Sequence, residues 1–314
     1  MGQKYLLPDK LVAGDRVRFV SPASPIARGG LKDATKILED LGLVVEYGEH
    51  VYNVDDSIDY LAGKDEDRLA DINEALRDPN VKAIIATRGG KGAYRIADGL
   101  DFIAARNCPK LLIGFSEITI LHMALLKNSG VAGLHGAPWD AEGFGEETAL
   151  SFVRAVTSTG KIVIHAAKKE STYALTTHGR ASGILIGGNQ DSIATGAGWV
   201  LPSFDKAILL IEAVNLRLGH IDRQLTMLIK TGIIKNVVGV AIGQYTDCGA
   251  ATDPTTDVKC TEIDILRDRF AQIGVPILGG LPIGHGKNPI AVPIGTWTTL
   301  DADAETLTVD PVVK

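Results

Sequence analysis

A serine at position 116 stands where a nucleophile could act. It follows the short apolar run Lys110–Gly114 and precedes the apolar helical segment Ile118–Lys127, so the chain is expected to turn sharply there. The free N–H groups of a first helical turn favour negative charge close by. Gly114-Phe115-Ser116-Glu117-Ile118 therefore has the form of a nucleophile elbow without its second glycine, and an ordinary helix N-cap is the alternative interpretation.

A nucleophilic serine needs a base and a carboxylate that orients this base. Glu212 follows the apolar run Ala207–Ile211, so its carboxylate is either such an orienting group or a solvated strand end. Of the seven histidines, His285 lies between two glycines that leave its ring accessible, and His135 in a tight loop is the second candidate. These residue types together are typical of nucleophilic attack on a carbonyl carbon.

A glycine-rich turn, Arg88-Gly89-Gly90-Lys91-Gly92, follows the apolar run Val81–Ala86. Glycines let the backbone approach a ligand closely. The turn matches neither the dinucleotide fingerprint nor a Walker loop, so a plain tight turn or a weak phosphate loop remain alternatives. Gly187-Gly188-Asn189 follows a later strand and is equally open to both interpretations.

The elements that position these residues are short apolar runs alternating with amphipathic stretches, which predict repeated strand–turn–helix units. We expect strands at Val17–Val20, Val44–Tyr47, Val81–Ala86 and Lys110–Gly114, and helices at Leu31–Leu41, Asp65–Leu76 and Ile118–Lys127. The predicted fold class is α/β, with an open, mostly parallel sheet of the flavodoxin or Rossmann kind. Such sheets bind ligands at the carboxyl ends of their strands, where the turns at Arg88 and Ser116 would lie.

The chain is predicted to form two domains. Residues 1–155 form the nucleophile domain, the polar stretch 156–180 is expected to be a linker, and 181–314 form a smaller mixed α/β domain that carries Glu212 and His285. In this second half we expect strands at Ala181–Ile186, Lys206–Ile211 and Val237–Ile242, a helix at Arg217–Thr231 and a β-rich end at Pro289–Val309.

Composition narrows the function classes. The 314 residues carry a net charge of −6, which argues against a nucleic-acid partner and against an anionic membrane surface. Three cysteines without a C-x-x-C pair predict reduced thiols, and no apolar run reaches the length of a signal peptide or a membrane span. Without H-E-x-x-H or paired Cys/His spacing we expect no metal. The chain is thus predicted to be cytoplasmic.

Several segments, taken in order, resemble one family, the LD-carboxypeptidases, which include murein tetrapeptide carboxypeptidases and microcin C immunity peptidases. The similarity runs from about Leu11 to about Pro293. The segments that carry it are Tyr60-Leu61-Ala62-Gly63, Asp65-Glu66-Asp67-Arg68, Ala86-Thr87-Arg88-Gly89-Gly90, Gly114-Phe115-Ser116-Glu117-Ile118-Thr119, His135-Gly136-Ala137-Pro138, Ile186-Gly187-Gly188-Asn189, Leu210-Ile211-Glu212, Ile221-Asp222-Arg223-Gln224-Leu225 and Gly284-His285-Gly286.

The resemblance implies a catalytic triad of Ser116, Glu212 and His285. It implies an oxyanion hole from the backbone N–H groups of Gly90 and Glu117, no cofactor, and a homodimer. The implied substrate is a small peptide, a cytosolic murein tetrapeptide that loses its terminal D-alanine during cell-wall recycling. Arg88 and Lys91 are candidates for the substrate carboxylate, and Asn189 and His135 are further expected substrate contacts.

Three residues depart from the family pattern: Glu117 replaces an aspartate, Lys91 an aromatic residue, and Ala137 the proline of H-G-P, with Pro138 following it. One rival function is an immunity peptidase that cleaves peptidyl-nucleotide or acyl-sulfamoyl adenylate amides. The short stretch between Ser116 and Glu212 favours the compact recycling type. The other rival is a non-enzymatic small-molecule binding protein, and a dinucleotide-dependent oxidoreductase lacks its glycine fingerprint.

Overall fold

The first of two sheets is open and mostly parallel, as predicted. A computed structural model describes residues 5–137, 145–249 and 259–314. The sheet has the order β11-β5-β4-β3-β1-β2, and only β11 runs antiparallel to its neighbour. Its strands are β1 (Arg16–Val20), β2 (Val44–Tyr47), β3 (Val81–Ala86), β4 (Leu111–Gly114), β5 (Gly133–His135) and β11 (Val292–Ile294). Its helices are α1 (Lys32–Asp40), α2 (Asp65–Arg77), α3 (Phe102–Asn107), α4 (Thr119–Asn128) and α5 (Glu146–Thr157).

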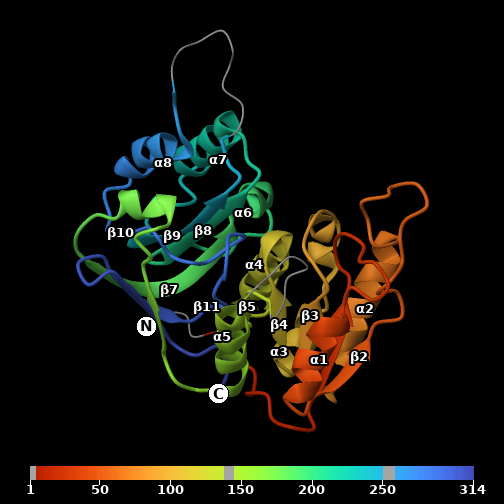
Figure 1. The fold of residues 1–314 in the computed structure, drawn as a ribbon. Coiled ribbons are helices and arrows are strands. Elements are labelled where there is room, and N and C mark those ends of the chain that lie inside the picture. Colours follow the sequence, from red (N-terminus) through yellow and green to blue (C-terminus); the bar gives the residue numbers. More distant parts are fainter. Residues whose placement is uncertain (1–4, 138–144, 250–258) are drawn as a thin grey trace.

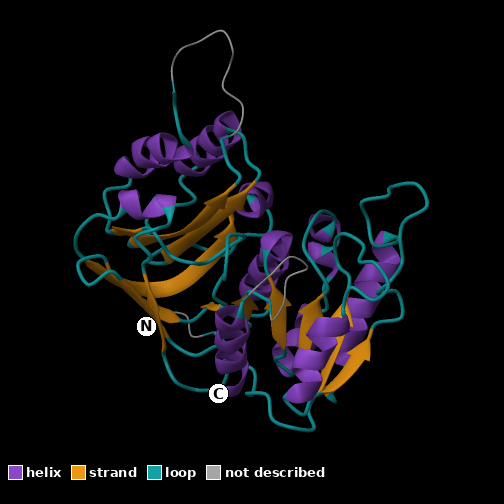
Figure 2. Cartoon of the chain, viewed as in Figure 1, coloured by secondary structure: helices purple, strands orange, loops and turns teal. Residues whose placement is uncertain are grey.

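The second sheet is mixed and has seven strands in the order β10-β9-β8-β7-β12-β13-β6. Strands β7 to β10 are parallel, whereas β7, β12, β13 and β6 pair antiparallel. The strands are β6 (Ile162–His165), β7 (Arg180–Asn189), β8 (Ile208–Val214), β9 (Gly239–Thr246), β10 (Ile277–Leu278), β12 (Trp297–Asp301) and β13 (Thr306–Val309). Helices α6 (Gln190–Gly196), α7 (Leu218–Lys230) and α8 (Glu262–Ala271) belong to this half, and Figure 2 shows α7 and α8 over one side of the sheet.

The stretch 156–180 differs from the expected linker because it contains regular structure. Strand β6 pairs with β13 at the edge of the second sheet, and a 3-10 helix follows at Ser171–Leu175. In β6, Ile162 and Ile164 are buried while Val163 and His165 are exposed, which is the alternation of a half-buried strand. Strand β11 also differs from the predicted division into two domains. It lies within the predicted second domain, 181–314, but pairs with β5 at the edge of the first sheet.

The central strands of both sheets are buried, and their carboxyl ends lie near the junction of the two halves. Strands β3, β4 and β8 are buried over nearly their whole length, because other elements cover both faces of each sheet. Figure 1 shows the two sheets side by side, and α4 of the first half packs against α6 of the second. The carboxyl ends of β3, β4, β7 and β8 are therefore held close to the junction of the two halves.

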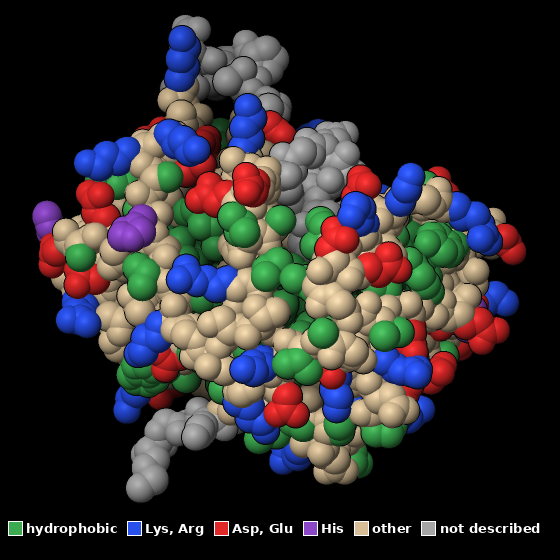
Figure 3. All heavy atoms as spheres, turned by 60° about the horizontal axis from the view of Figure 1, so that its bottom comes forward, with side chains coloured by type: hydrophobic (Ala, Val, Ile, Leu, Met, Phe, Trp, Pro, Cys, Tyr) green, Lys and Arg blue, Asp and Glu red, His purple; other side chains and the backbone are tan. Residues whose placement is uncertain are grey.

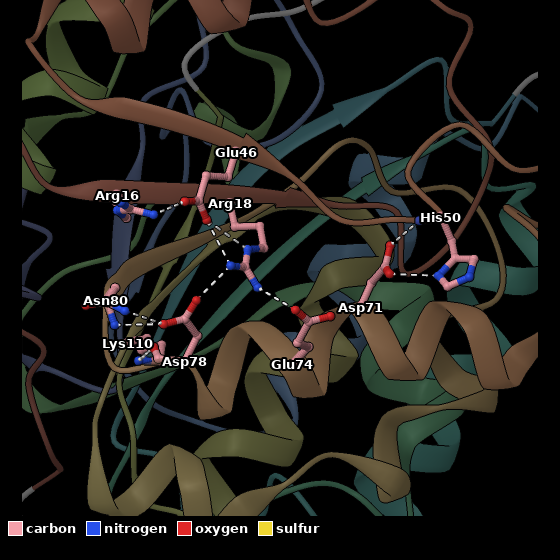
Figure 4. Close-up of polar contacts among 9 residues, drawn as sticks. All are labelled: Arg16, Arg18, Glu46, His50, Asp71, Glu74, Asp78, Asn80 and Lys110. Carbon is pink, nitrogen blue, oxygen red and sulfur yellow. Dashed lines mark hydrogen bonds and ion pairs between the residues drawn. The ribbon is translucent and has the colours of Figure 1, made fainter.

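A network of charged side chains joins β1 and β2 to α2 and the turn after it (Figure 4). The Arg18 guanidinium lies 2.8 Å from both Glu46 Oε2 and Asp78 Oδ2. Burial opposes the charge of Arg18, but the hydrogen bond and charge of Glu46 and the charge of Asp78 outweigh it and raise its pKa. His50 Nδ1 lies 2.8 Å from Asp71 Oδ1, and this contact attaches the loop after β2 to the same helix.

Figure 3 shows one face of the molecule, on which basic and acidic side chains are interspersed. That face therefore has no extended basic patch of the kind that binds nucleic acid. No helix in the described parts of the chain has the length and apolar character needed to cross a membrane.

Candidate active site

Ser116 lies in a strained turn at the carboxyl end of β4. A 3-10 turn, Ser116–Ile118, leads from the strand into α4. Ser116 has a φ of 61°, in the left-handed region that side chains other than glycine rarely adopt. Strain of this kind concentrates at functional sites, and a strained strand-to-helix turn is the feature that defines a nucleophile elbow. The geometry favours the elbow interpretation over a plain N-cap, and Ser116 caps no helix through its side chain.

The glycine turn after β3 lies against Ser116. A Cβ atom on Gly89 would be 2.6 Å from Ser116 Cβ, so this approach requires glycine. Ser24 holds the turn from the other side: its N–H donates to Gly89 O (3.2 Å), and its Oγ accepts from the Lys91 N–H (3.0 Å). Among the described residues, the Gly90 N–H between these two bonds donates to no protein acceptor.

Glu117 ties the serine turn to the glycine turn. Its side chain is buried, and Oε2 accepts a hydrogen bond of 2.8 Å from the Ala93 N–H, just beyond the glycine turn. Burial raises the pKa of Glu117 to about 7, although the Ala93 hydrogen bond and the charges of Arg68 and Lys91 act in the opposite direction. The longer glutamate thus has a structural contact of its own where the family pattern has aspartate.

Glu212 and His285 form a hydrogen-bonded pair in the second half. Glu212 lies in β8 with no exposed surface, and His285 lies in the loop after β10. His285 Nδ1 is 2.8 Å from Glu212 Oε2. The loop is held in place by Gln244, whose Oε1 accepts from the Gly286 N–H at 2.8 Å. This arrangement leaves Nε2 of His285 as the ring nitrogen that is free to exchange a proton with another group.

The environment of Glu212 favours its ionised form. Burial alone would raise its pKa, but the charge and hydrogen bond of His285, together with the neighbouring His135 and Asn189, bring the pKa below its ordinary value. A buried carboxylate that stays ionised can fix the tautomer of His285 and stabilise its cation.

The serine and the histidine come from different halves, and Phe115, the residue before Ser116, brings the two halves into contact at this point. The ring centroids of Phe115 and His285 are 4.9 Å apart, so the residue beside Ser116 contacts the histidine directly. Between Ser116 and His285 themselves the described residues show no hydrogen bond. Such bonds are often long without substrate and shorten when the reacting complex forms.

A cleft of about 550 Å³ opens beside Ser116 at the junction of the two halves. The first half contributes Gly90, Lys91, Tyr94, Ser116, Glu117 and Ile120 to its lining. The second half contributes Asn189, Asp191, Ser192, Thr195, Val214, Asn215 and Leu216. Its volume suits a ligand of several residues rather than a single ion.

The four expected substrate contacts lie in different environments. Lys91 lines the cleft and is exposed, whereas Arg88 is not among the described lining residues and its Nη1 lies 3.4 Å from Pro25 O. Asn189 lines the cleft but is buried, and its Oδ1 accepts from the Ser192 N–H at 3.2 Å. His135 is 1% exposed and does not line this cleft, whereas a substrate contact was expected of it.

Residue Asp191 was not singled out by the sequence pattern, yet it lines the cleft. It follows the Gly187-Gly188-Asn189 turn in the first turn of α6. The useful signal would have been its place just after the carboxyl end of a parallel strand. Pro138, the other residue that bears on the H-G-P segment, lies outside the described residues.

The described residues contain no group of three or more His, Cys, Asp or Glu side chains that could hold a metal ion. The three cysteines are all free thiols.

The fold and this site define a two-part α/β peptidase, and the chain belongs to the LD-carboxypeptidase family. Family models described as the LD-carboxypeptidase N-terminal and C-terminal domains match residues 17–136 and 182–300. A probable murein peptide carboxypeptidase of Bacillus subtilis is 33% identical over 316 residues, covering 98% of this chain and 95% of that protein.

Two solved structures extend the comparison. The muramoyltetrapeptide carboxypeptidase from Oxalobacter formigenes has a TM-score of 0.80 and 25% identity, covering 94% of this chain and 98% of that one. The microcin C7 self immunity protein MccF in complex with aspartyl sulfamoyl adenosine has a TM-score of 0.85 and 20% identity, covering 98% and 100%. At this identity the second comparison shows a common fold alone.

Proposed function

We propose that this peptidase is a serine-type LD-carboxypeptidase that releases D-alanine from a murein tetrapeptide. The observation that carries the proposal is the pairing of the buried Glu212 with His285 at 2.8 Å, together with a cleft whose lining includes the strained Ser116. Relatives named for murein peptides support this substrate class.

In the proposed mechanism Ser116 Oγ attacks the carbonyl carbon of the scissile amide. His285 Nε2 takes the serine proton and then gives it to the leaving amine, while Glu212 stabilises the imidazolium. The N–H groups of Gly90 and Glu117 bind the tetrahedral oxyanion. Water then attacks the acyl-enzyme, with His285 again as base, and releases the shortened peptide and the free serine.

The charges of the cleft support a substrate that carries both signs. Lys91 and Asp191 line it from opposite halves, and Asp191 Oδ1 accepts a hydrogen bond from Gln224 Nε2. Both also act on the carboxyl of Glu117, beside Ser116, Lys91 lowering and Asp191 raising its pKa. We assign Lys91 to the terminal carboxylate of the substrate and Asp191 to an ammonium on the residue before the scissile bond.

A second candidate function, the rival that the family resemblance also implies, is cleavage of acyl-sulfamoyl adenylate amides; MccF has been solved with aspartyl sulfamoyl adenosine. The two functions use the same serine chemistry and differ in the leaving group. A panel of LD- and DL-linked tetrapeptides and an aminoacyl sulfamoyl adenosine separates them, with the released product identified by mass. Release of D-alanine only from the LD-linked peptide supports the murein substrate.

The triad is tested by Ser116→Ala and by a fluorophosphonate label. We expect the label on Ser116 of the wild type, and loss of turnover in the folded S116A variant. Retained turnover in S116A would refute serine catalysis, and binding of the peptides without hydrolysis by the wild type would identify a small-molecule binding protein instead. We also propose that the protein is a homodimer in the cytoplasm, as the family resemblance implies. Light scattering of the purified protein measures its oligomeric state.

A further inference from the structure

Glu212 lies between two imidazoles. Its Oε2 contacts His285 Nδ1 at 2.8 Å, and its Oε1 lies 4.0 Å from His135 Nε2. Glu212 and His135 are both buried, with 0% and 1% of their side chains exposed. In the described part of the chain, neither Glu212 Oε1 nor either ring nitrogen of His135 has a hydrogen-bond partner. A separation of 4.0 Å exceeds a hydrogen bond, so these two unpaired polar atoms lie just outside bonding distance, where a small shift of either side chain would join them.

The backbone of His135 is fixed by two neighbouring strands. His135 is the last residue of β5, in register with Gly114 of β4 on one side and Val292 of β11 on the other. Strand β4 leads directly into the turn at Ser116. The same strand pair therefore places both the nucleophile and His135, whereas Glu212 belongs to the other sheet.

The ring of His135 is also confined. The Phe115 ring meets it edge-on, with centroids 6.2 Å apart. On another side a Cβ atom on Gly188 would be 2.9 Å from His135 Nδ1 and 2.5 Å from Thr119 Oγ1, so only glycine allows this packing. Gly188 precedes Asn189, which is in register with Glu212. The ring therefore has little freedom to turn away from the carboxylate.

Burial favours the neutral form of the His135 imidazole. Burial lowers the pKa of His135 to about 4, and the nearby carboxylate of Glu212 offsets this only in part. A neutral imidazole carries one N–H and one lone pair. A cation at this position would compete with His285 for the carboxylate, whereas a neutral N–H can hold one carboxylate oxygen and leave the charge available to His285.

We propose that His135 is a positioning residue: an N–H on its Nε2 holds Glu212 Oε1, so that Oε2 stays aligned with His285. This inference rests on the proposed triad. It also gives the histidine of the His135-Gly136-Ala137 segment a role beneath the cleft instead of a contact with substrate.

Two variants of the full chain test the proposal. The amide nitrogen of glutamine reaches the place of Nε2, whereas that of asparagine reaches only the place of Nδ1, so H135N removes the donor and H135Q keeps it. We expect H135N to lower kcat about 10–100-fold with little change in KM, and H135Q to recover most of this loss. A proton NMR spectrum should show the downfield His285 Nδ1–H resonance displaced in H135N and restored in H135Q.

A wild-type kcat in a folded H135N variant would overturn the proposal. Equal losses of kcat in H135N and H135Q, with the His285 Nδ1–H resonance unchanged, would also overturn it, because they would indicate a role in packing alone. If neither variant folds, ¹⁵N-histidine NMR of the wild type decides, with signals assigned by substituting the other histidines one at a time. The proposal requires His135 to stay neutral with its proton on Nε2 from about pH 5.5 to about pH 8. A proton on Nδ1, or titration in this range, overturns it. Retained turnover in S116A would instead defeat the proposed function and leave this tautomer result unaffected.

Discussion

An alanine at Gly90 tests the proposed oxyanion turn directly. Gly90 has a φ of 103°, and a Cβ atom there would lie 2.2 Å from Ser24 Oγ and 2.6 Å from Ser24 Cβ. Contacts this short do not occur between real atoms, so the turn must move away from Ser24. Because Ser24 bonds to the residues on both sides of Gly90, the displacement also moves the Gly90 N–H.

Two separate costs follow from this substitution. A side chain in the left-handed region destabilises the fold by about 1–2 kcal/mol. Misplacing one oxyanion donor lowers kcat by roughly 10²–10³, which is the effect we expect for G90A on D-alanine release. The first cost appears in the free energy of unfolding and the second in the rate of the chemical step.

Gly14→Ala is the matched control. Gly14 has a φ of 91°, and a Cβ atom there would meet nothing within 4 Å, so G14A carries the backbone cost without the collision. Urea unfolding and steady-state kinetics are measured for both variants. Because G90A also carries the collision with Ser24, we expect it to lose more stability than G14A. We expect a loss of kcat in G90A alone, partly recovered by Ser24→Gly in the double variant. A kcat for G90A within about threefold of that for G14A would refute the role of this turn.

Three further predictions concern charged residues. Burial raises the pKa of Glu117 in the folded protein to about 7, against an ordinary value of 4.5. Between these two pH values the folded protein keeps the carboxyl proton that the unfolded chain has lost. The free energy of unfolding therefore falls by ~3 kcal/mol as the pH rises through this range. Urea unfolding of E117Q at several pH values should lack this part of the slope; an unchanged slope contradicts the assignment. Asp191→Asn should lower kcat/KM about 5–30-fold for a peptide with an ammonium before the scissile bond and leave a norleucine analogue unaffected, and equal losses for both peptides would argue against the assigned contact. Arg18→Met leaves Glu46 and Asp78 without their shared cation, so urea unfolding should show a loss of about 1–3 kcal/mol; wild-type stability would show that the network contributes little.

Much of the fold could be predicted because its local signals agree. The predicted strands at Val81–Ala86 and Lys110–Gly114 correspond to β3 and β4, and the predicted helix at Arg217–Thr231 corresponds to α7. Strand β6 was not predicted, because four residues on a sheet edge give too short an alternation. The position of β11 in the first sheet depends on contacts across the whole chain and leaves no local pattern.

The site could be predicted only in its parts. The apolar strand, turn and helix around residue 116 indicate an exposed serine, and the structure places Ser116 in a strained turn there. The flanking glycines favour His285 among the seven histidines, but nothing local pairs it with Glu212, because the two lie 73 positions apart. The order of family motifs supplied that pairing. His135 was expected in a tight loop, but it ends strand β5, and pairing of β5 with strands on both sides buries it.

The place of β11 has a consequence for how the protein is made. Residues 292–294 seal the edge of β5, the strand that neighbours β4 and its nucleophile turn. During synthesis this edge therefore stays unpaired until residues 292–294 have left the ribosome, and an open edge invites pairing with other chains. The first half is thus not a separable module: a fragment cut after α5 would keep Ser116 yet expose the flank beside it.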